Sequence, residues 1–283
     1  MGYRFAFALA MLAIYSGNFG HAQGPLRERL GKKLTEAKQD AADIKRVTWK
    51  IGTIEREALV YVPAAKKDEK RPLIIAFHGH GGRAEYSARK FTLHTLWPEA
   101  VCIYPQGLPT AVPVIDPQGT KPGWQKYVGD QADRDLAFFD ELLKTAAAEY
   151  QIDEQRIYVT GHSNGGYFTY VLNAARGDKL AAIAPVAAGI NPRDTKNYKA
   201  LPTFHVAGEQ DKIVRFATQE RTIKEVRKLN GCDAEGKAAG KWCTEYSSAK
   251  GPPVITMIHP GAHEVPNEAP PRIVEFFKTQ VRK

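Results

Sequence analysis

The chain has 283 residues, of which 43% are hydrophobic and 25% charged, the composition of an ordinary globular protein with room for a sizeable core. Lysine and arginine outnumber aspartate and glutamate by 40 to 31, but basic and acidic residues are interspersed along the chain. This distribution argues against a nucleic-acid-binding surface, which needs a basic stripe or patch, and leaves an acidic polysaccharide as the alternative anionic partner.

The N-terminus has the three parts of a secretory signal: M-G-Y-R, an apolar run at 5–15, and small and polar residues that end in G-H-A at 20–22. We expect cleavage before Gln23, so that residues 1–22 are a signal peptide. The apolar run falls well short of the ~20 residues that span a bilayer, and the boundary has no cysteine for lipid attachment. The sequence therefore predicts a secreted or periplasmic protein without stable membrane insertion.

Residues 23–46 are highly charged, yet apolar residues recur at three- and four-residue steps, which predicts an amphipathic helix or a flexible segment. From Val47 the pattern changes to alternation, with V-T-W-K-I and E-R-E-A-L-V-Y-V-P on either side of a turn at Gly52 and Thr53. This alternation predicts an antiparallel pair of strands that opens one domain over residues 47–283.

Short, nearly continuous apolar runs then alternate with longer helical patterns, as strands buried on both faces of a parallel sheet require. The runs lie at 73–77, 101–104, 157–160, 183–186, 203–206 and 254–258, and the clearest helical patterns at 133–150, 166–175 and 270–281. We predict an α/β fold with a mostly parallel central sheet, an antiparallel N-terminal pair and helices on both faces. The long connection at 105–126 is expected to serve function.

The stretch V-T-G-H-S-N-G-G-Y at 159–167 places a G-x-S-x-G pentapeptide between a strand pattern and a helical pattern. Such a pentapeptide arises by chance in roughly one chain in ten, but the strand-turn-helix context is the one that a nucleophilic serine requires. Gly161 and Gly165 remove side chains that would collide with the neighbouring strand and helix. We therefore predict that Ser163 is a nucleophile and not a structural serine.

A serine hydroxyl needs a base to take its proton and a carboxylate to orient that base. Asp211 follows one predicted strand, in G-E-Q-D-K-I-V, and His263 follows the last one, in H-P-G-A-H-E-V-P. Glu209 is the alternative acid and His259 the alternative base. The chain order serine, aspartate, histidine is that of α/β-hydrolases.

The turn F-H-G-H-G-G at 77–82 follows the first buried strand, where backbone N–H groups can stabilise the negative oxygen of a tetrahedral intermediate. We assign this oxyanion hole to the N–H groups of His80 and Asn164. The alternative is a structural turn stabilised by His78. Metal binding by His78 and His80 is not expected, because no carboxylate or third histidine accompanies them.

Other residues have roles that depend on export or on the substrate. Trp124, at the end of the long connection, either stacks on the acyl or sugar part of a substrate or anchors the loop. Cys102 lies in an apolar run and is expected to be buried. Cys232 and Cys243 lie in a polar insert, where a disulfide in an oxidising compartment is favoured over free thiols and zinc.

Together these motifs resemble those of the secreted α/β-hydrolase esterases grouped as feruloyl esterase and poly(3-hydroxybutyrate) depolymerase-like enzymes. The resemblance covers residues 46–281 and rests on V-Y-V-P at 60–63, H-G-x-G-G at 78–82, Y-P-Q-G at 104–107, R-I-Y-V-T-G-H-S-N-G-G at 156–166, G-E-Q-D-K-I-V at 208–214, N-G-C at 230–232 and G-A-H-E-V-P at 261–266. It implies an α/β-hydrolase fold and ester hydrolysis.

Two features depart from that family. His162 and Asn164 flank Ser163 where the family often has a small residue, and Val265-Pro266 follows the base in place of Trp-Pro. The nucleophile, acid and base stay intact, but the acyl pocket is left open, and His162 becomes a candidate substrate-binding residue.

The sequence therefore predicts a serine esterase that needs no metal or organic cofactor and acts on a polymer-linked ester. Its substrate is expected to be a hydroxycinnamoyl or acetyl ester of a polysaccharide, or a short-chain polyhydroxyalkanoate. One alternative is a serine peptidase of the prolyl-oligopeptidase type, in which a large gating domain usually precedes the catalytic one, where this chain has only residues 23–46. Another is a non-catalytic envelope or polysaccharide-binding protein on the same fold.

Overall fold

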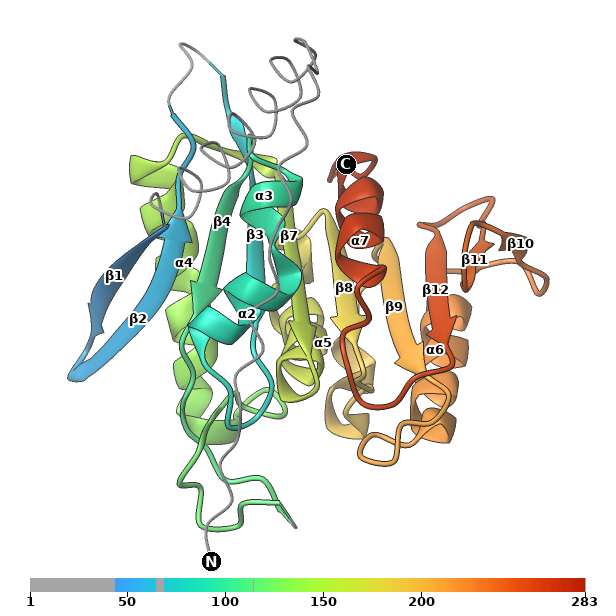
Figure 1. Ribbon diagram of the computed structural model, residues 1–283, viewed down its shortest axis with the longest axis horizontal. Coiled ribbons are helices and arrows are strands. Elements are labelled where there is room, and N and C mark those ends of the chain that lie inside the picture. Colours follow the sequence, from blue (N-terminus) through green and yellow to red (C-terminus); the bar gives the residue numbers. More distant parts are fainter. Residues whose placement is uncertain (1–43, 65–68, 114, 283) are drawn as a thin grey trace, which may run out of the picture. The chain divides into compact units, whose positions relative to one another are not determined.

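A ten-stranded sheet forms the centre of the fold, with its strands in the order β1-β2-β4-β3-β7-β8-β9-β12-β11-β10 (Figure 1). The computed structural model describes residues 44–64, 69–113 and 115–282. The predicted signal peptide at 1–22, and all but the end of the charged segment at 23–46, lie outside the described residues.

The middle of the sheet is parallel and its two edges are antiparallel. β4, β3, β7, β8, β9 and β12 run parallel, β1 and β2 form the predicted N-terminal antiparallel pair, and β11 and β10 add an antiparallel edge. The strands are β1 (Ile44–Ile51), β2 (Ile54–Tyr61), β3 (Arg71–Phe77), β4 (Val101–Pro105), β7 (Ile152–His162), β8 (Ala182–Val186), β9 (Thr203–Gly208), β10 (Lys237–Ala238), β11 (Cys243–Tyr246) and β12 (Val254–His259), with a separate hairpin of β5 (Leu108–Pro109) and β6 (Pro122–Gly123).

The first strand begins earlier than the sequence pattern indicates. β1 starts at Ile44, which pairs with Tyr61 of β2, so the predicted boundary at Val47 is wrong. The helical spacing of apolar residues extends by coincidence into Ile44, whereas pairing with β2 decides the local structure.

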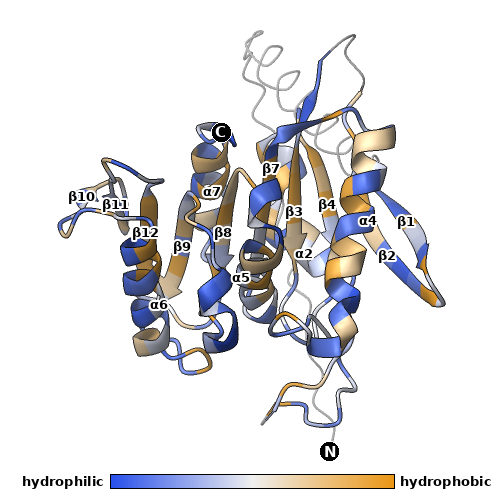
Figure 2. Ribbon diagram, turned by 180° about the vertical axis from the view of Figure 1, so that it is seen from behind, coloured by the Kyte–Doolittle hydropathy of each residue, from blue (hydrophilic) through white to orange (hydrophobic). Residues whose placement is uncertain are grey.

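Helices cover both faces of the sheet, as predicted. α2, α3 and α7 lie on the face that is in front in Figure 1, and α4, α5 and α6 lie on the face that is in front in Figure 2. Their bounds are α2 (Ala84–Phe91), α3 (Leu93–Leu96), α4 (Arg134–Glu149), α5 (Asn164–Arg176), α6 (Phe216–Leu229) and α7 (Ala269–Lys278), with 3₁₀ turns η1 (Asp130–Asp133), η2 (Gly177–Lys179) and η3 (Pro192–Asn197). Among the described residues, no helix has the length and apolar character needed to cross a membrane.

Each central strand supplies side chains alternately to two cores. In β3, Leu73, Ile75 and Phe77 pack in the core under α4, α5 and α6, and Ile74 and Ala76 pack in the core under α2, α3 and α7. Every residue of β3 is buried, and Figure 2 shows hydrophobic colour along the central strands. Burial on both faces explains the continuous apolar runs of the sequence.

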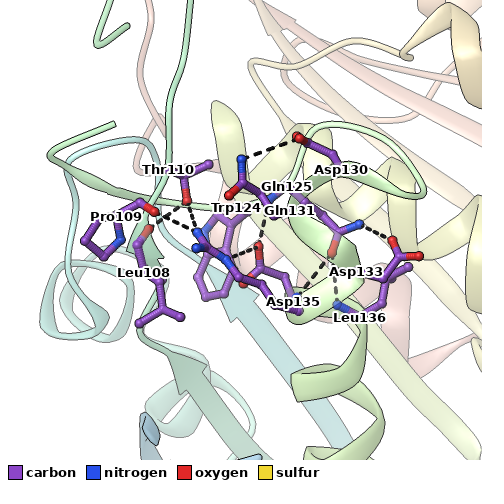
Figure 3. A network of polar contacts seen from close by, with 12 residues as sticks. Leu108, Pro109, Thr110, Trp124, Gln125, Asp130, Gln131, Asp133, Asp135 and Leu136 are labelled. Atoms are coloured by element: carbon purple, nitrogen blue, oxygen red, sulfur yellow. Dashed lines mark hydrogen bonds and ion pairs between the residues drawn. The ribbon is translucent and has the colours of Figure 1, made fainter. Parts of the chain in front are cut away.

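Buried charges anchor the long connection at 105–126. Arg56 of β2 and Asp135 of α4 form an ion pair at 2.9 Å, with side chains 1% and 0% exposed. The other carboxylate oxygen of Asp135 accepts the Gln125 N–H at 2.8 Å, and the Gln125 side chain accepts N–H groups at the start of α4 (Figure 3). Breaking a buried ion pair leaves an uncompensated charge, so this network fixes the end of the connection to β2 and α4.

All three cysteines are free thiols, and the predicted disulfide between Cys232 and Cys243 is therefore wrong. Cys243 lies in β11 and is buried in the core under α2, α3 and α7, whereas Cys232 packs against the opposite core. The two side chains face opposite sides of the sheet, and a disulfide needs both to point toward each other. Cys102 is fully buried in β4, as predicted.

These positions predict the outcome of a thiol titration. Unfolded, unreduced protein is expected to react with a chromogenic thiol reagent at all three cysteines. In the folded protein Cys102 is expected to stay unreactive, because burial excludes the reagent and raises the pKa of the Cys102 thiol. A single reactive thiol in the unfolded, unreduced chain would contradict the structure and restore the disulfide between Cys232 and Cys243.

Candidate active site

Ser163 lies on a sharp turn between β7 and α5. Its backbone has φ 56° and ψ −120°, a left-handed conformation that is strained for a residue with a Cβ atom. Close approach of the chain requires glycine on either side: a Cβ on Gly161 would lie 2.4 Å from the carbonyl oxygen of Gly165, and one on Gly165 would lie 2.5 Å from that of Phe77. As expected from the sequence, a side chain at Gly161 or Gly165 would collide with neighbouring backbone, and glycine avoids this collision.

Three loops bring Ser163, Asp211 and His263 together at the edge where the parallel strands β7, β9 and β12 end (Figure 1). His263 Nε2 lies 2.8 Å from Ser163 Oγ, and His263 Nδ1 lies 2.8 Å from Asp211 Oδ2. A carboxylate only accepts hydrogen bonds, so neutral His263 carries its hydrogen on Nδ1 and its Nε2 accepts the Ser163 hydroxyl. The geometry is that of a serine whose proton has a positioned acceptor.

The two alternative residues lie outside this group. Glu209 is exposed. His259 is the last residue of β12, and its Nδ1 accepts the N–H of Gly261 at 3.1 Å. The structure therefore places His263, and not His259, beside Ser163, and it places Asp211, and not Glu209, beside His263.

Hydrogen bonds hold the buried Asp211 carboxylate in one orientation. Its Oδ1 accepts the N–H groups of Ile213 and Val214, both at 2.9 Å, and its Oδ2 accepts the Gln219 amide at 3.0 Å. These donors come in addition to His263, so both carboxylate oxygens are satisfied. Asp211 is thereby fixed as the group that orients His263.

The turn after β3 lies beside Ser163. A Cβ added to Gly79 would lie 3.3 Å from the Cβ of Ser163, and His80 and Ser163 border the same cavity. Among the described residues, no acceptor takes the backbone N–H of His80 or of Asn164. Both N–H groups that the sequence assigns to an oxyanion hole are thus free to bind a ligand oxygen.

His78 stabilises this turn from within the protein. Its Nδ1 donates to the Gly79 carbonyl oxygen at 2.7 Å, and its Nε2 accepts the Gly107 N–H at 2.9 Å. Burial lowers the pKa of His78 to about 4, so the ring is neutral at physiological pH, as this pattern of one donor and one acceptor requires. The structural role that the sequence left open for His78 is the observed one.

Trp124 is fully buried, so its prediction as a substrate-stacking residue is wrong. Its ring stacks on Phe168 at 5.5 Å and meets Phe77 edge-on at 5.0 Å. The Asn164 side chain holds the Trp124 backbone on both sides: Oδ1 accepts the Trp124 N–H at 2.7 Å, and Nδ2 donates to the Trp124 carbonyl oxygen at 3.0 Å. Trp124 therefore anchors the long connection to the start of α5, and this role of the Asn164 side chain has no local sequence signal.

His162 lies in the cavity wall next to the candidate base. Its ring centroid is 4.9 Å from that of His263, and the side chain is buried. Burial, reinforced by the neighbouring His263, lowers the pKa of His162 to about 4. His162 is therefore neutral at physiological pH and places no positive charge against His263.

A cavity of about 480 Å³ opens over Ser163 and His263, and we call it the catalytic cavity. Three large exposed hydrophobic side chains border it: Tyr86 of α2, Ile115 of the long connection and Ile213 of the loop after β9. The three residues lie far apart in the sequence, and only the fold brings them to one rim. Such a rim suits the apolar part of a ligand.

The long connection also supports the turn that carries His80. His80 Nε2 lies 3.2 Å from Asp116 Oδ2, and the Asp116 carboxylate accepts the N–H groups of Lys121 and Thr120 at 2.8 and 3.2 Å. These backbone donors hold the pKa of the Asp116 carboxyl below its usual value. Asp116, which the sequence did not single out, thus links the connection to the His80 side chain, and so to the turn that carries the free His80 N–H.

The chain is similar to known hydrolases in sequence. Residues 111–207 match the model of the prolyl oligopeptidase family. A bifunctional acetylxylan esterase/xylanase of Neocallimastix patriciarum is 27% identical over 199 residues, 70% of this chain and 27% of that protein. Feruloyl esterase D of Neurospora crassa is 24% identical over 156 residues, 53% of this chain and 52% of that protein. The chain thus spans about half or less of the length of these relatives.

A solved structure of a thermostable esterase superposes with a TM-score of 0.62 at 19% identity, covering 86% of this chain and 64% of that one. This chain has the α/β-hydrolase fold. At that identity the match concerns the fold alone, and the chemistry of this α/β-hydrolase depends on its own site residues.

Replacing Trp124 tests its role as an anchor. Trp124→Ala is expected to lower the free energy of unfolding by about 3–5 kcal/mol, because it leaves a cavity between Phe77 and Phe168. Urea unfolding measures this loss, and Trp242→Ala, at a half-buried position, serves as the control with an expected loss of about 1 kcal/mol. Equal, small losses in both variants would contradict the anchoring role.

Buried neutral histidines predict how stability depends on pH. The pKa values of His78, His162 and His205 are each lowered from 6.5 to about 4, so the unfolded chain binds more protons between these values. The stabilisation is complete above pH 6.5 and is lost as the pH falls toward 4, by roughly 1–2 kcal/mol per histidine at pH 5. Urea unfolding at a series of pH values is expected to show this decline, with a smaller slope in His205→Gln. A flat profile would contradict it.

Proposed function

We propose that this α/β-hydrolase is a serine esterase that hydrolyses carboxylic esters through an acyl-enzyme. The observation that carries the proposal is the continuous hydrogen-bonded series of Ser163, His263 and Asp211, with both contacts at 2.8 Å. This arrangement provides the nucleophile, the base and the orienting carboxylate of a catalytic triad. The similarity to an acetylxylan esterase and a feruloyl esterase supports esters as the substrate class.

In the acylation step, His263 Nε2 takes the hydroxyl proton as Ser163 Oγ forms a bond to the ester carbonyl carbon. The carbonyl oxygen becomes negative and accepts hydrogen bonds from the free N–H groups of His80 and Asn164. Asp211 stabilises the His263 imidazolium, which then donates its proton to the leaving alcohol oxygen as the carbon–oxygen bond breaks.

In the second step, water takes the place of the alcohol. His263 removes a proton from the water, whose oxygen attacks the acyl carbon, and the proton returns to Ser163 Oγ as the carboxylic acid leaves. One ester and one water give one acid and one alcohol. The neutral His162 ring beside His263 leaves the base free of a repelling charge in both steps.

The substrate we propose is a hydroxycinnamoyl or acetyl ester of a polysaccharide. The hydrophobic rim of Tyr86, Ile115 and Ile213 supports an apolar acyl group at the catalytic cavity. The signal-like sequence at 1–22 supports export from the cytoplasm. An exported enzyme would meet a polysaccharide substrate outside the cytoplasm.

The decisive experiment is hydrolysis of p-nitrophenyl acetate and butyrate. Ser163→Ala is expected to lower kcat by about 10⁴-fold or more, and Asp211→Asn by about 10⁴-fold, because each removes part of a unit that acts together. A fluorophosphonate probe is expected to label Ser163 in the wild-type protein and nothing in Ser163→Ala.

The control is Ser247→Ala, at an exposed position outside the lining of the catalytic cavity, and this variant is expected to keep wild-type activity. Unlabelled, inactive wild-type protein would indicate a binding protein on the hydrolase fold. The match of residues 111–207 to the prolyl oligopeptidase family makes a prolyl p-nitroanilide the comparison substrate, and faster cleavage of that anilide would overturn the ester proposal.

A further inference from the structure

A second cavity, of about 410 Å³, opens beside the loop after β12. We call it the Trp242 cavity; its side-chain lining includes Lys90, Trp242, His259, Glu264, Asn267 and Glu268. It lies along the same two elements as the catalytic cavity. α2 contributes Tyr86 to the catalytic cavity and Lys90 to this one, and the loop after β12 contributes His263 and Glu264 respectively. Both cavities are therefore bordered by α2 and by the loop that carries the candidate base.

His259 gives this cavity an unsatisfied hydrogen-bond donor. The side chain is 2% exposed, and its Nδ1 accepts the Gly261 N–H at 3.1 Å, so the neutral ring carries its hydrogen on Nε2. Burial lowers the pKa of His259, which keeps the ring neutral. Nε2 is buried and has no acceptor among the described residues. A buried donor without an acceptor costs about 1–3 kcal/mol, and an oxygen atom of a ligand in the cavity would satisfy it.

Trp242 gives the cavity an aromatic surface, and its backbone is strained. It is half-buried, its ring centroid lies 6.2 Å from that of His259, and its backbone φ is 61°. A bulky residue in the left-handed region costs of order 1–3 kcal/mol, and such outliers cluster at ligand sites. The strain is maintained by the sheet edge, where the Trp242 carbonyl oxygen accepts the Ile258 N–H at 2.9 Å.

The charges around the cavity balance. Glu268 pairs with Lys241 at 2.6 Å, and the Lys241 ammonium lies 4.1 Å from the Trp242 ring centroid. The remaining carboxylate of Glu264 is offset by Lys90 in the same lining. Neither an anion nor a cation is therefore favoured. An uncharged ligand that offers many hydroxyl groups and one apolar face matches an aromatic ring, amide, carboxylates and a free imidazole N–H.

We propose that the Trp242 cavity binds a sugar ring in the alcohol part of the ester. The proposal rests on the proposed function, because that mechanism fixes which part of the ester lies here. His263 has to give its proton to the leaving alcohol oxygen, so the alcohol lies on the His263 side of Ser163. The loop that carries His263 is also the loop that borders the Trp242 cavity.

The test compares two esters with the same acyl group and different alcohols, an acetylated methyl xylopyranoside and ethyl acetate. In Trp242→Ala, kcat/KM for the sugar ester is expected to fall roughly 10-fold, from the loss of stacking and hydrogen-bond geometry, while kcat/KM for ethyl acetate stays within about twofold. Trp242→Phe keeps an aromatic ring and is expected to restore most of the loss. Tyr86→Ala, at the rim of the catalytic cavity, is the control and is expected to lower both substrates alike.

Equal losses on both esters in Trp242→Ala would overturn the proposal and give Trp242 a structural role. A binding measurement separates this outcome from failure of the esterase proposal. Binding of methyl xylopyranoside to the Ser163→Ala protein is measured by isothermal titration calorimetry. The double variant Trp242→Ala/Ser163→Ala is measured in the same way for comparison. Binding that is lost with Trp242 supports the sugar site even if no ester is hydrolysed. Absence of binding, together with equal losses of kcat/KM on both esters in Trp242→Ala, refutes it.

Discussion

The left-handed turn at Ser163 is the constraint on which the rest of the site depends. β7 leads into it from the middle of the sheet, paired with β3 on one side and β8 on the other. The Ser163 N–H donates to the Val186 carbonyl oxygen at 2.9 Å, and the Ser163 carbonyl oxygen accepts the Tyr167 N–H at 2.9 Å. A strained residue persists only where its neighbours determine it this fully. The sheet therefore supplies the energy that holds the hydroxyl beside His263.

The same turn is connected to the far side of the sheet by a series of buried polar contacts. The Asn164 side chain holds the Trp124 backbone, and the next residue, Gln125, is held by Asp135, which pairs with Arg56 of β2. The indole N–H of Trp124 also donates to the carbonyl oxygen of His78, in the turn after β3, at 2.9 Å. Each side chain in the series is buried and has a polar partner. Removing one side chain therefore leaves a buried polar group of the next residue without its partner. The free N–H groups beside Ser163 thus owe their positions to residues that contact no substrate.

Local patterns made part of this structure predictable and left part of it out of reach. The parallel strands, the glycines around Ser163, and the placement of Asp211 and His263 after strands depend on residues close in sequence, and the structure brings them together as expected. Trp124 gave no such signal, because an aromatic residue in a loop has the same sequence pattern whether it is buried or exposed. The disulfide prediction was wrong for a related reason. The spacing of the two cysteines allowed a bond, but the alternation of side chains along β11 decides on which face of the sheet Cys243 lies. Asp116 and the rim at Ile115 and Ile213 arise from contacts between distant segments.

The loop after β12 borders both cavities. It presents His263 to the serine, and it borders the cavity that contains the unsatisfied donor of His259 and the strained backbone of Trp242. Unsatisfied or strained groups reduce the stability of the folded chain, and they cluster where proteins bind ligands. Because the alcohol oxygen has to approach His263, a sugar ring that accepts the His259 N–H in this cavity would also bring its ester carbonyl toward Ser163. Binding energy from a part of the substrate remote from the reacting bond is then used to orient that bond, which raises the rate of the chemical step and not only the affinity.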